Sequence, residues 1–340
     1  VINQRCCEIY ADPQKLKDAG EQKRIAELAA EYFGSDPKRV LVRMKKKYVQ
    51  PNPGTNPIPC RYALITRHAS IEQTTMFTEK LKNLNLEKRV YVRENMKRYY
   101  PNGSLLANVL GIVTLDDEKR GQFGIEAWIY NEAQRKNRLE QVFLTINLDM
   151  QKMLESELNE LEKKCAPGYL CAILVNPRNG NILAIAQRPD FNPNERDSLS
   201  MHQPGITRNF IFGNSFKPGP MIIPLVVAGA LSQRVAGAAE KIPCEGSPYT
   251  LNGKSVENPV PVAELTPLEI IVNNSQIGAA NLGLRMGHQL YGWLGNLGIG
   301  QSCGLSLFPE TVYRLRKPAG FKGSGMAAPS TGYGFKVTTA

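Results

Sequence analysis

The spacing of apolar and polar residues predicts a mixture of helices and strands in the first hundred residues. Residues 22–33 repeat their apolar side chains with helical spacing and end before a glycine, which predicts a helix. Asp36, which precedes a proline, marks the start of a second helix, and residues 71–84 are predicted to form a third. Residues 3–13 are predicted to form a strand that ends in a turn, and the alternation in residues 89–93 predicts another strand.

A different pattern follows in the second part of the chain. Residues 142–146 are predicted to form a strand, and residues 149–164 to form a long amphipathic helix. The apolar residues of this helix are expected to face the core: Met150, Met153, Leu154, Leu158 and Leu161. Two β-rich runs, residues 170–176 and 182–186, flank an Asn-Gly pair, which is a strong hairpin signal. A helix packed on an antiparallel sheet is therefore expected.

Chain length and composition favour two globular domains. The chain has 340 residues, whereas a single domain usually holds about 100–200. The change of pattern near residue 140 predicts domains at residues 1–140 and 141–340. No apolar run reaches the roughly 20 residues that a membrane-spanning helix needs. Three further helices are predicted in the second domain, at residues 222–231, 267–272 and 276–286.

Positive charge is concentrated at the beginning of the chain. The whole sequence has a net charge of 42 − 31 = +11, and residues 1–100 hold 20 Lys and Arg against 11 Asp and Glu, a net of +9. This region could face an anionic membrane, an anionic polymer or nucleic acid, and the alternative is a solvated basic face without a partner. The seven cysteines and three histidines have no metal-ligand spacing, so neither a metal nor a cofactor is predicted.

Several landmark segments follow one another along the chain. The segments are residues 3–13, 100–113 (YPNGSLLANVLGIV), 121–126 (GQFGIE), 143–151 (FLTINLDMQ), 172–186 (AILVNPRNGNILAIA), 189–194 (PDFNPN), 297–304 (LGIGQSCG) and 332–338 (GYGFKVT). In this order they resemble landmarks of the class B penicillin-binding proteins. Any one of these matches is weak, but together they cover nearly the whole sequence.

This resemblance implies an α+β fold in two parts. Residues 1–140 would form an elongated N-terminal pedestal, similar to the family's dimerisation domain. Residues 141–340 would form a penicillin-binding, β-lactamase-like transpeptidase domain with helices on an antiparallel sheet. The family's K-T-G motif does not occur before Ala340, so the C-terminal part of the sheet is expected to lie outside this sequence.

The resemblance also implies an acyl-transfer reaction in which a serine of an S-x-x-K motif attacks a stem peptide. That motif aligns with residues 214–217, where Lys217 is retained but Asn214 occupies the nucleophile position. An amide is not a usable nucleophile, because its nitrogen lone pair is delocalised. Ser215 is the nearest hydroxyl, but on a helix it would point away from Lys217. Gly219 and nearby prolines are expected to disturb the family's regular helix.

The second motif, S-x-N in the family, is also altered. Its serine position aligns with Asn274 and its asparagine position with Gln276. Shifting the frame to use Ser275 as the motif serine places Ile277 where asparagine belongs. The first motif therefore lacks its serine, and the second lacks both its serine and its asparagine.

Three functions are compatible with these observations. The altered motifs favour a non-catalytic scaffold of the peptidoglycan synthesis machinery, in septal or elongation complexes. The alternative is an active D,D-transpeptidase with a non-standard site, which would bind peptidoglycan stem peptides. The ordered landmarks argue against the third function, an unrelated basic binding protein.

The resemblance implies a location and partners as well. Such proteins are held at the extracytoplasmic face of the bacterial cytoplasmic membrane by an N-terminal helix, expected here outside the sequence. They work with a membrane glycosyltransferase and other division or elongation proteins, and nucleic acid is not an expected partner. The contacts are expected to lie in residues 1–140, and Lys45, Lys46 and Lys47 are predicted to face an anionic membrane or wall surface.

Overall fold

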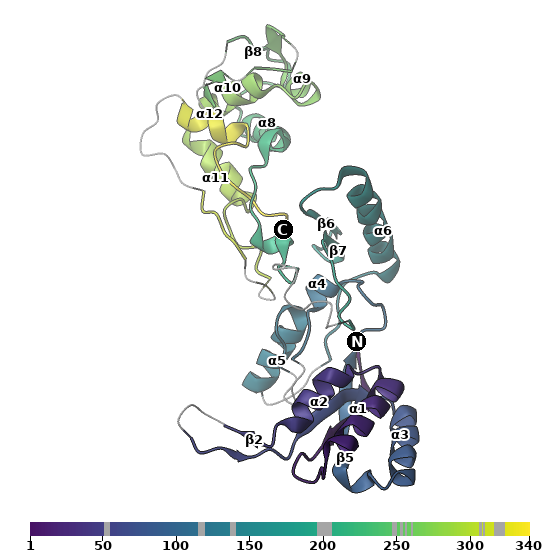
Figure 1. Ribbon diagram of the computed structural model, residues 1–340. Helices are drawn as coiled ribbons and strands as arrows, with labels where there is room; N and C mark the ends of the chain where they lie inside the picture. The colour runs from purple at the N-terminus through teal and green to yellow at the C-terminus, as the bar shows by residue number, and fades with distance from the viewer. Residues whose placement is uncertain are drawn as a thin grey trace. The chain divides into compact units, whose positions relative to one another are not determined.

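The chain forms two compact units, Val1–Gly103 and Ser104–Ala340, which are considered separately (Figure 1). The structure is a computed structural model. It describes residues 1–50, 55–114, 120–136, 141–195, 206–246, 250–251, 254–255, 257–259, 261–305, 308, 310–315 and 324–340. The domain boundary predicted at residues 140/141 stays a prediction.

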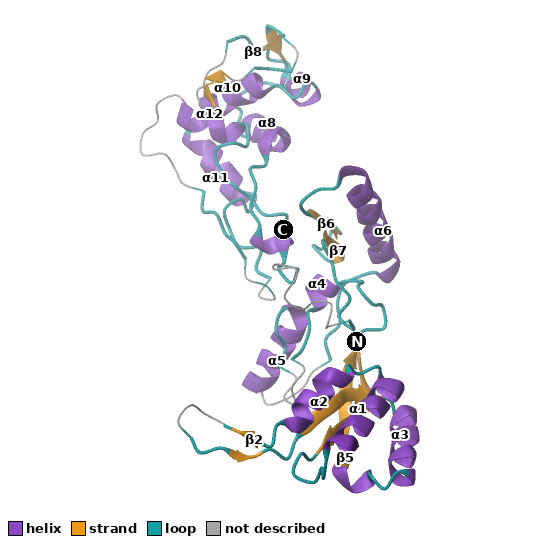
Figure 2. Ribbon diagram, in the orientation of Figure 1, coloured by secondary structure: helices purple, strands orange, loops and turns teal. Residues whose placement is uncertain are grey.

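The first unit is a three-stranded antiparallel sheet with three helices packed against it (Figure 2). The strands lie in the order β4-β1-β5, and β1 pairs with β5 along its whole length. The main elements are β1 (Ile2–Ala11), α1 (Ala19–Phe33), α2 (Pro37–Lys45), β4 (Ala63–Ala69), α3 (Ile71–Asn83), a 3-10 turn η1 (Glu87–Arg89) and β5 (Val90–Tyr99). Ile9, Ile25, Met44 and Phe77 are buried between the sheet and the helices.

Capping residues fix the helix boundaries of this unit where the sequence predicts them. The Asp36 side chain accepts a hydrogen bond from the Lys38 backbone N–H at the start of α2. Gly34 adopts the left-handed conformation that ends α1. The predicted helices and strands of the first hundred residues are therefore confirmed, and β5 is longer than predicted. A short hairpin of β2 (Tyr48–Val49) and β3 (Ile58–Pro59) follows α2.

In the second unit, two landmark segments meet backbone to backbone. They carry α4 (Ala107–Leu110) and α5 (Gly124–Lys136), which contact each other. Gly111 has a φ of +77°, and a Cβ atom there would lie 1.9 Å from the Phe123 carbonyl oxygen. Only glycine allows this close approach, which explains why a glycine follows α4.

The centre of the second unit is the hairpin of β6 (Leu170–Val175) and β7 (Ile182–Arg188), with α6 (Leu148–Cys165) packed against β7. The hairpin and the long helix are confirmed. The strand predicted at residues 142–146 is wrong, because this segment joins β7 only through single bonds, such as that from Thr145 Oγ1 to the Ile182 carbonyl oxygen.

The expected orientation of the long helix is also wrong in part. Leu158 is buried, but Met153 is 67% exposed, and Met150 and Leu161 are exposed too. The buried positions are instead taken by Gln151 and Glu155. The apolar side chains could not reveal this arrangement, because polar residues that are satisfied by hydrogen bonds can occupy a helix face as well as apolar ones.

The remainder of the second unit is mostly helical, and the predicted helices at residues 222–231, 267–272 and 276–286 are confirmed. Val226, Ile270, Leu282 and Leu290 are buried in the core that these helices share. The described elements are α7 (Phe210–Gly213), a 3-10 turn η2 (Gly219–Ile222), α8 (Ile223–Ser232), β8 (Ile242–Pro243), β9 (Thr250–Leu251), β10 (Lys254–Ser255), β11 (Glu264–Leu265), α9 (Pro267–Val272), α10 (Gln276–Met286), α11 (His288–Asn296) and α12 (Ser324–Ser330). β8 pairs with β11, and β9 with β10.

Candidate functional site

The floor of the candidate site is built by polar residues of α6. Asn147 caps this helix by accepting hydrogen bonds from the backbone N–H groups of Asp149 and Met150. The Gln151 side chain pairs with β7, because its amide donates to the Ile185 carbonyl oxygen at 2.9 Å and its oxygen accepts from the Ile185 N–H at 2.9 Å. One side chain thus replaces a neighbouring strand along this part of β7.

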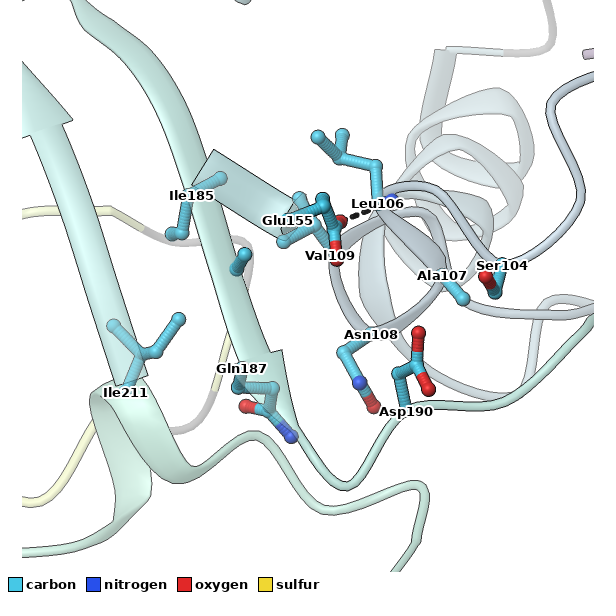
Figure 3. A pocket seen from close by; sticks show the side chains of 11 residues that line it. Ser104, Leu106, Ala107, Asn108, Val109, Glu155, Ile185, Gln187, Asp190 and Ile211 are labelled. Carbon is cyan, nitrogen blue, oxygen red and sulfur yellow. Dashed lines mark hydrogen bonds between the residues drawn. The ribbon is translucent and has the colours of Figure 1, made fainter. Parts of the chain in front are cut away.

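A buried ion pair fixes the end of β7 to the same helix. Arg188 donates from Nη1 to Glu155 Oε2 at 2.7 Å, and both side chains are largely buried. The guanidinium also donates to Asn159 Oδ1 and to the Glu155 carbonyl oxygen. The other carboxylate oxygen, Oε1, accepts from the Leu106 backbone N–H at 3.2 Å, the bond drawn in Figure 3. The pair therefore connects α6, β7 and the segment before α4.

The cavity beside this pair is too small for a substrate. Its volume of about 10 Å³ corresponds to about one water molecule. Asn108, Gln187 and Asp190 line it together with Glu155 (Figure 3). Asn108 also donates from Nδ2 to the Pro189 carbonyl oxygen at 3.3 Å. These residues hold the fold together. Polar residues repeated at i and i+4 on α6 are the sequence signal that could have identified Gln151 and Glu155.

The segment aligned with S-x-x-K is extended rather than helical. Phe216 and Val337 exchange two backbone hydrogen bonds, each 2.8 Å long, in an antiparallel bridge. Asn214 ends α7 with extended backbone angles, φ −97° and ψ 131°. A 3-10 turn begins only at Gly219, and α8 begins at Ile223. The expectation that prolines and glycine disturb the family's helix is confirmed.

The landmark at residues 332–338 holds this extended segment in place. The Gly219 N–H donates to the Gly332 carbonyl oxygen at 3.1 Å. Gly332 has a φ of +76°, and a Cβ atom there would lie 2.0 Å from the Gly219 carbonyl oxygen. Glycine is therefore required for the two segments to approach.

The extended backbone changes which side chains share a face. In a strand, residues i and i+2 point to the same side, whereas i and i+3 do not. Ser215 and Lys217 flank the bridged Phe216, so they lie on one side of the segment. The expectation that Ser215 points away from Lys217 assumed a helix, and it is wrong because the segment is extended. Asn214, at i−3 from Lys217, points to the other side.

The side chains of this segment make few polar contacts. Lys217 is exposed, and Asn214 and Ser215 are half-buried. Among the described residues, no hydrogen bond or ion pair joins the Lys217 ammonium to Asn214, Ser215, Asn274 or Gln276. The retained lysine is therefore not assembled with the residues at the other motif positions.

The segment aligned with the second motif is the start of α10. Ser275 is buried and caps this helix by accepting from the Gly278 N–H at 3.0 Å, and its hydroxyl donates to Asn258 Oδ1 at 2.9 Å. Asn274 is exposed and has a φ of +51°, a conformation that asparagine tolerates better than most residues. Gln276 is the first residue of α10. Ser275 and Asn274 thus have structural roles, helix capping and a left-handed turn.

A charged surface network holds α9, which precedes this turn. Glu269 accepts from the Thr266 backbone N–H at 2.7 Å and from the Lys241 ammonium at 3.0 Å. The Thr266 backbone bond, followed by the Lys241 and Thr266 side chains, lowers the pKa of the Glu269 carboxyl to about 2. The acidic residue at this position therefore stays ionised over the ordinary pH range.

A larger hollow of about 320 Å³ lies elsewhere in the second unit, and none of the aligned motif residues lines it. Its wall includes Cys303, whose backbone N–H donates to Glu310 at 2.8 Å, and Lys336, whose ammonium lies 5.3 Å from the Tyr313 ring centre. Burial raises the pKa of the Cys303 thiol.

Within the part of the chain that the structure describes, no helix is both long and apolar enough to cross a membrane.

Two family models together match most of the chain. The model of the penicillin binding protein transpeptidase domain matches residues 170–340, and that of the penicillin-binding protein dimerisation domain matches residues 1–142. Both matches agree with the resemblance that the landmark segments carry.

Curated relatives carry related descriptions. Stage V sporulation protein D of Bacillus subtilis is 28% identical over 293 residues, which are 73% of this chain and 43% of that protein. Peptidoglycan D,D-transpeptidase FtsI of Escherichia coli K12 is 27% identical over 273 residues, 73% of this chain and 45% of that protein. The chain thus spans less than half the length of these relatives.

The solved structures confirm the fold class. The crystal structure of penicillin binding protein 2X from Streptococcus thermophilus matches with a TM-score of 0.67 at 14% identity, covering 99% of this chain and 54% of that one. A peptidoglycan synthetase from Bifidobacterium adolescentis matches with a TM-score of 0.60 at 20% identity, over 99% of this chain and 66% of that one. Since the transpeptidase model matches half of the sequence and the dimerisation model most of the rest, the chain belongs to the class B penicillin-binding proteins.

Proposed function

We propose that the chain is a component of the peptidoglycan synthesis machinery that acts as a scaffold and does not catalyse transpeptidation. The observation that carries this proposal is the extended backbone at residues 214–217. It separates Asn214, the residue at the nucleophile position, from Lys217, the retained motif lysine. A covalent mechanism needs a nucleophile within hydrogen-bond reach of its base, and Asn214 supplies neither the nucleophile nor the contact.

The location and partners follow from the family. We infer that the protein works at the extracytoplasmic face of the bacterial cytoplasmic membrane, anchored by a helix outside this sequence. A membrane glycosyltransferase and other division or elongation proteins would bind residues 1–140. A scaffold needs the folded first unit and the α6–β7 junction. The β1–β5 pairing of the first and the Gln151–Ile185 hydrogen bonds of the second both involve landmark segments.

Acylation by a fluorescent penicillin tests the absence of catalysis. We expect no covalent adduct by gel fluorescence or intact-mass spectrometry, with Escherichia coli FtsI as the positive control. We also expect Asn214→Ser to remain unlabelled, because the new hydroxyl would lie on extended backbone away from Lys217. A stable mass gain in the unmodified chain would contradict the scaffold proposal.

A second function, an active D,D-transpeptidase that uses Ser215, is favoured by one observation. The Phe216–Val337 bridge turns Ser215 and Lys217 to the same side of the segment. Against it, Lys217 is exposed, whereas a lysine that acts as a base usually loses its proton through burial. Peptide mapping of any penicillin adduct decides between the two functions: an adduct at Ser215 that Ser215→Ala and Lys217→Ala abolish, and Ser302→Ala retains, would establish the active enzyme.

A further inference from the structure

One stretch of the first unit carries only positive charge. Between Pro37 and Ser70 the sequence has eight Lys and Arg residues and no Asp or Glu. This stretch runs through α2, the β2–β3 hairpin and β4, which follow one another along the first unit (Figure 1). Because α2 packs against the core on one side, only the charges on its outward side can meet a binding partner.

The outward face of α2 has an apolar residue at its centre and cations around it. Val40 and Met44 are buried in the core of the unit. At about 100° per residue, Val42 lies opposite these two, and it is 69% exposed. Lys38 and Lys45 lie within about 60° of Val42 on one side, and Lys46, at the C-terminal cap, lies within about 40° on the other.

The side chains of the three lysines of this face make no polar contact with other described residues. Among the described residues, no hydrogen bond or ion pair involves the ammonium groups of Lys38, Lys45 and Lys46. Lys47 differs, because its ammonium donates to the carbonyl oxygens of Pro13 and Leu16. The three neighbouring lysines are thus not equivalent, and Lys47 belongs to the structure of the unit rather than to its charged surface.

Strand β2 extends this surface with an exposed aromatic side chain. Tyr48 is 60% exposed and pairs with Pro59, whereas Ile58 pairs with Val49 and therefore points to the opposite face of the hairpin. Tyr48 follows the cationic end of α2 by two residues. Aromatic and aliphatic side chains beside lysines are typical of surfaces that lie on a lipid bilayer, where the apolar groups enter the headgroup region.

We propose that this α2 surface, which comprises Lys38, Val42, Lys45, Lys46 and Tyr48, binds an anionic lipid bilayer. The charge of the surface is complementary to anionic headgroups, and the exposed Val42 and Tyr48 gain from burial in the headgroup region. A soluble wall polymer would attract the lysines electrostatically but would not bury the apolar side chains. Binding to a bilayer does not depend on whether the chain catalyses transpeptidation, so a failure of this inference would leave the proposed function unaffected.

Vesicle flotation with the 340-residue chain tests this inference. The chain is expected to float with vesicles of equal parts phosphatidylcholine and phosphatidylglycerol, and not with phosphatidylcholine alone. Lys45→Gln with Lys46→Gln should lower the partition coefficient about thirtyfold, since each lysine near an anionic surface contributes about fivefold. Raising the salt from about 0.1 M to about 1 M should weaken the binding of the unmodified chain strongly.

Two further variants separate the possible causes. Lys80→Gln with Lys82→Gln removes the same charge from exposed positions on α3, and we expect it to retain binding within about twofold. Tyr48→Ser should lower the partition coefficient roughly threefold at unchanged charge. The inference is overturned if the chain does not float, if the α3 variant loses as much binding as the α2 variant, or if Tyr48→Ser has no effect, since the surface would then bind polyanions rather than a bilayer.

Discussion

Two regions of the second unit carry family landmarks, and they differ in how their polar side chains are used. At the α6–β7 junction, Gln151, Glu155 and Arg188 are buried. Their hydrogen bonds join the side chains of α6 to one another and to β7. In the segment at residues 214–217, the side chains of Asn214 and Lys217 have no hydrogen-bond partner among the described residues. The polar residues of the first region stabilise the fold, whereas the second region holds Asn214 where the family's motif has a serine.

On the scaffold proposal, this difference reflects what each region must do. Residues that support the fold are retained in any chain that must fold, because a buried polar group without its partner costs about 1–3 kcal/mol. Replacing a catalytic hydroxyl on an accessible segment carries no such cost in stability. The two regions therefore predict very different responses to substitution.

The largest effect is expected from Arg188→Ala. Removing one partner of a buried ion pair leaves the Glu155 carboxylate uncompensated, and the free energy of unfolding should fall by about 3–5 kcal/mol. Urea unfolding measures this loss. The double variant Glu155→Leu/Arg188→Met should be markedly more stable than the single one, and a double variant of equal or lower stability would show that the pair is not what stabilises the junction.

Gln151→Ala should lower the free energy of unfolding by about 2–3 kcal/mol, because the backbone N–H and carbonyl of Ile185 both lose their partner. Gln151→Met fills the same space without hydrogen bonds and serves as the control. If Gln151→Met unfolds at the same urea concentration as the unmodified chain, packing alone holds this strand.

A smaller effect, about 1 kcal/mol of the free energy of unfolding, is expected for Asn274→Ala. The left-handed backbone at φ +51° is less favourable for alanine than for asparagine. Asn274→Gly removes that penalty and should be within a few tenths of a kcal/mol of the unmodified chain. Equal losses for both variants would mean that the asparagine side chain itself, and not the backbone, is required.

A pH effect is expected at Glu269, whose pKa in the folded chain is about 2. Because the folded pKa lies below that of an unfolded glutamate, near 4.3, the carboxylate stabilises the fold above that pH. This contribution is lost as the pH falls from about 4.3 toward 2. Thermal unfolding of Glu269→Gln should accordingly lose less stability over this interval than the unmodified chain, and parallel curves would exclude the effect.

The smallest effect is expected at the retained motif lysine. Lys217→Ala should change the free energy of unfolding by less than about 0.5 kcal/mol, since its exposed ammonium has no partner among the described residues. Chemical unfolding beside Arg188→Ala provides the comparison. A loss above about 1 kcal/mol would place Lys217 with the structural residues and remove the contrast between the two regions.

Much of the fold could be predicted from the sequence, because caps and periodicity are local signals. Asp36, Gly34 and the Asn-Gly turn each act within a few residues. The orientation of α6 could not be predicted, since the burial of Gln151 depends on a strand more than thirty residues away. The conformation of the first motif could not be predicted either, because the bridge to Val337 joins residues more than a hundred positions apart. Sequence comparison identified the altered motif positions, and only the structure placed Ser215 on the side of Lys217.

The bridge between Phe216 and Val337 has a consequence for how this protein can change over generations. Asparagine and serine codons can differ by a single base, so a hydroxyl at position 214 is one mutational step away. On extended backbone, however, the Cα atoms of residues 214 and 217 lie about 10 Å apart, and their side chains point to opposite sides of the chain. A serine at position 214 would therefore not meet the motif lysine unless the pairing between two distant segments changed as well.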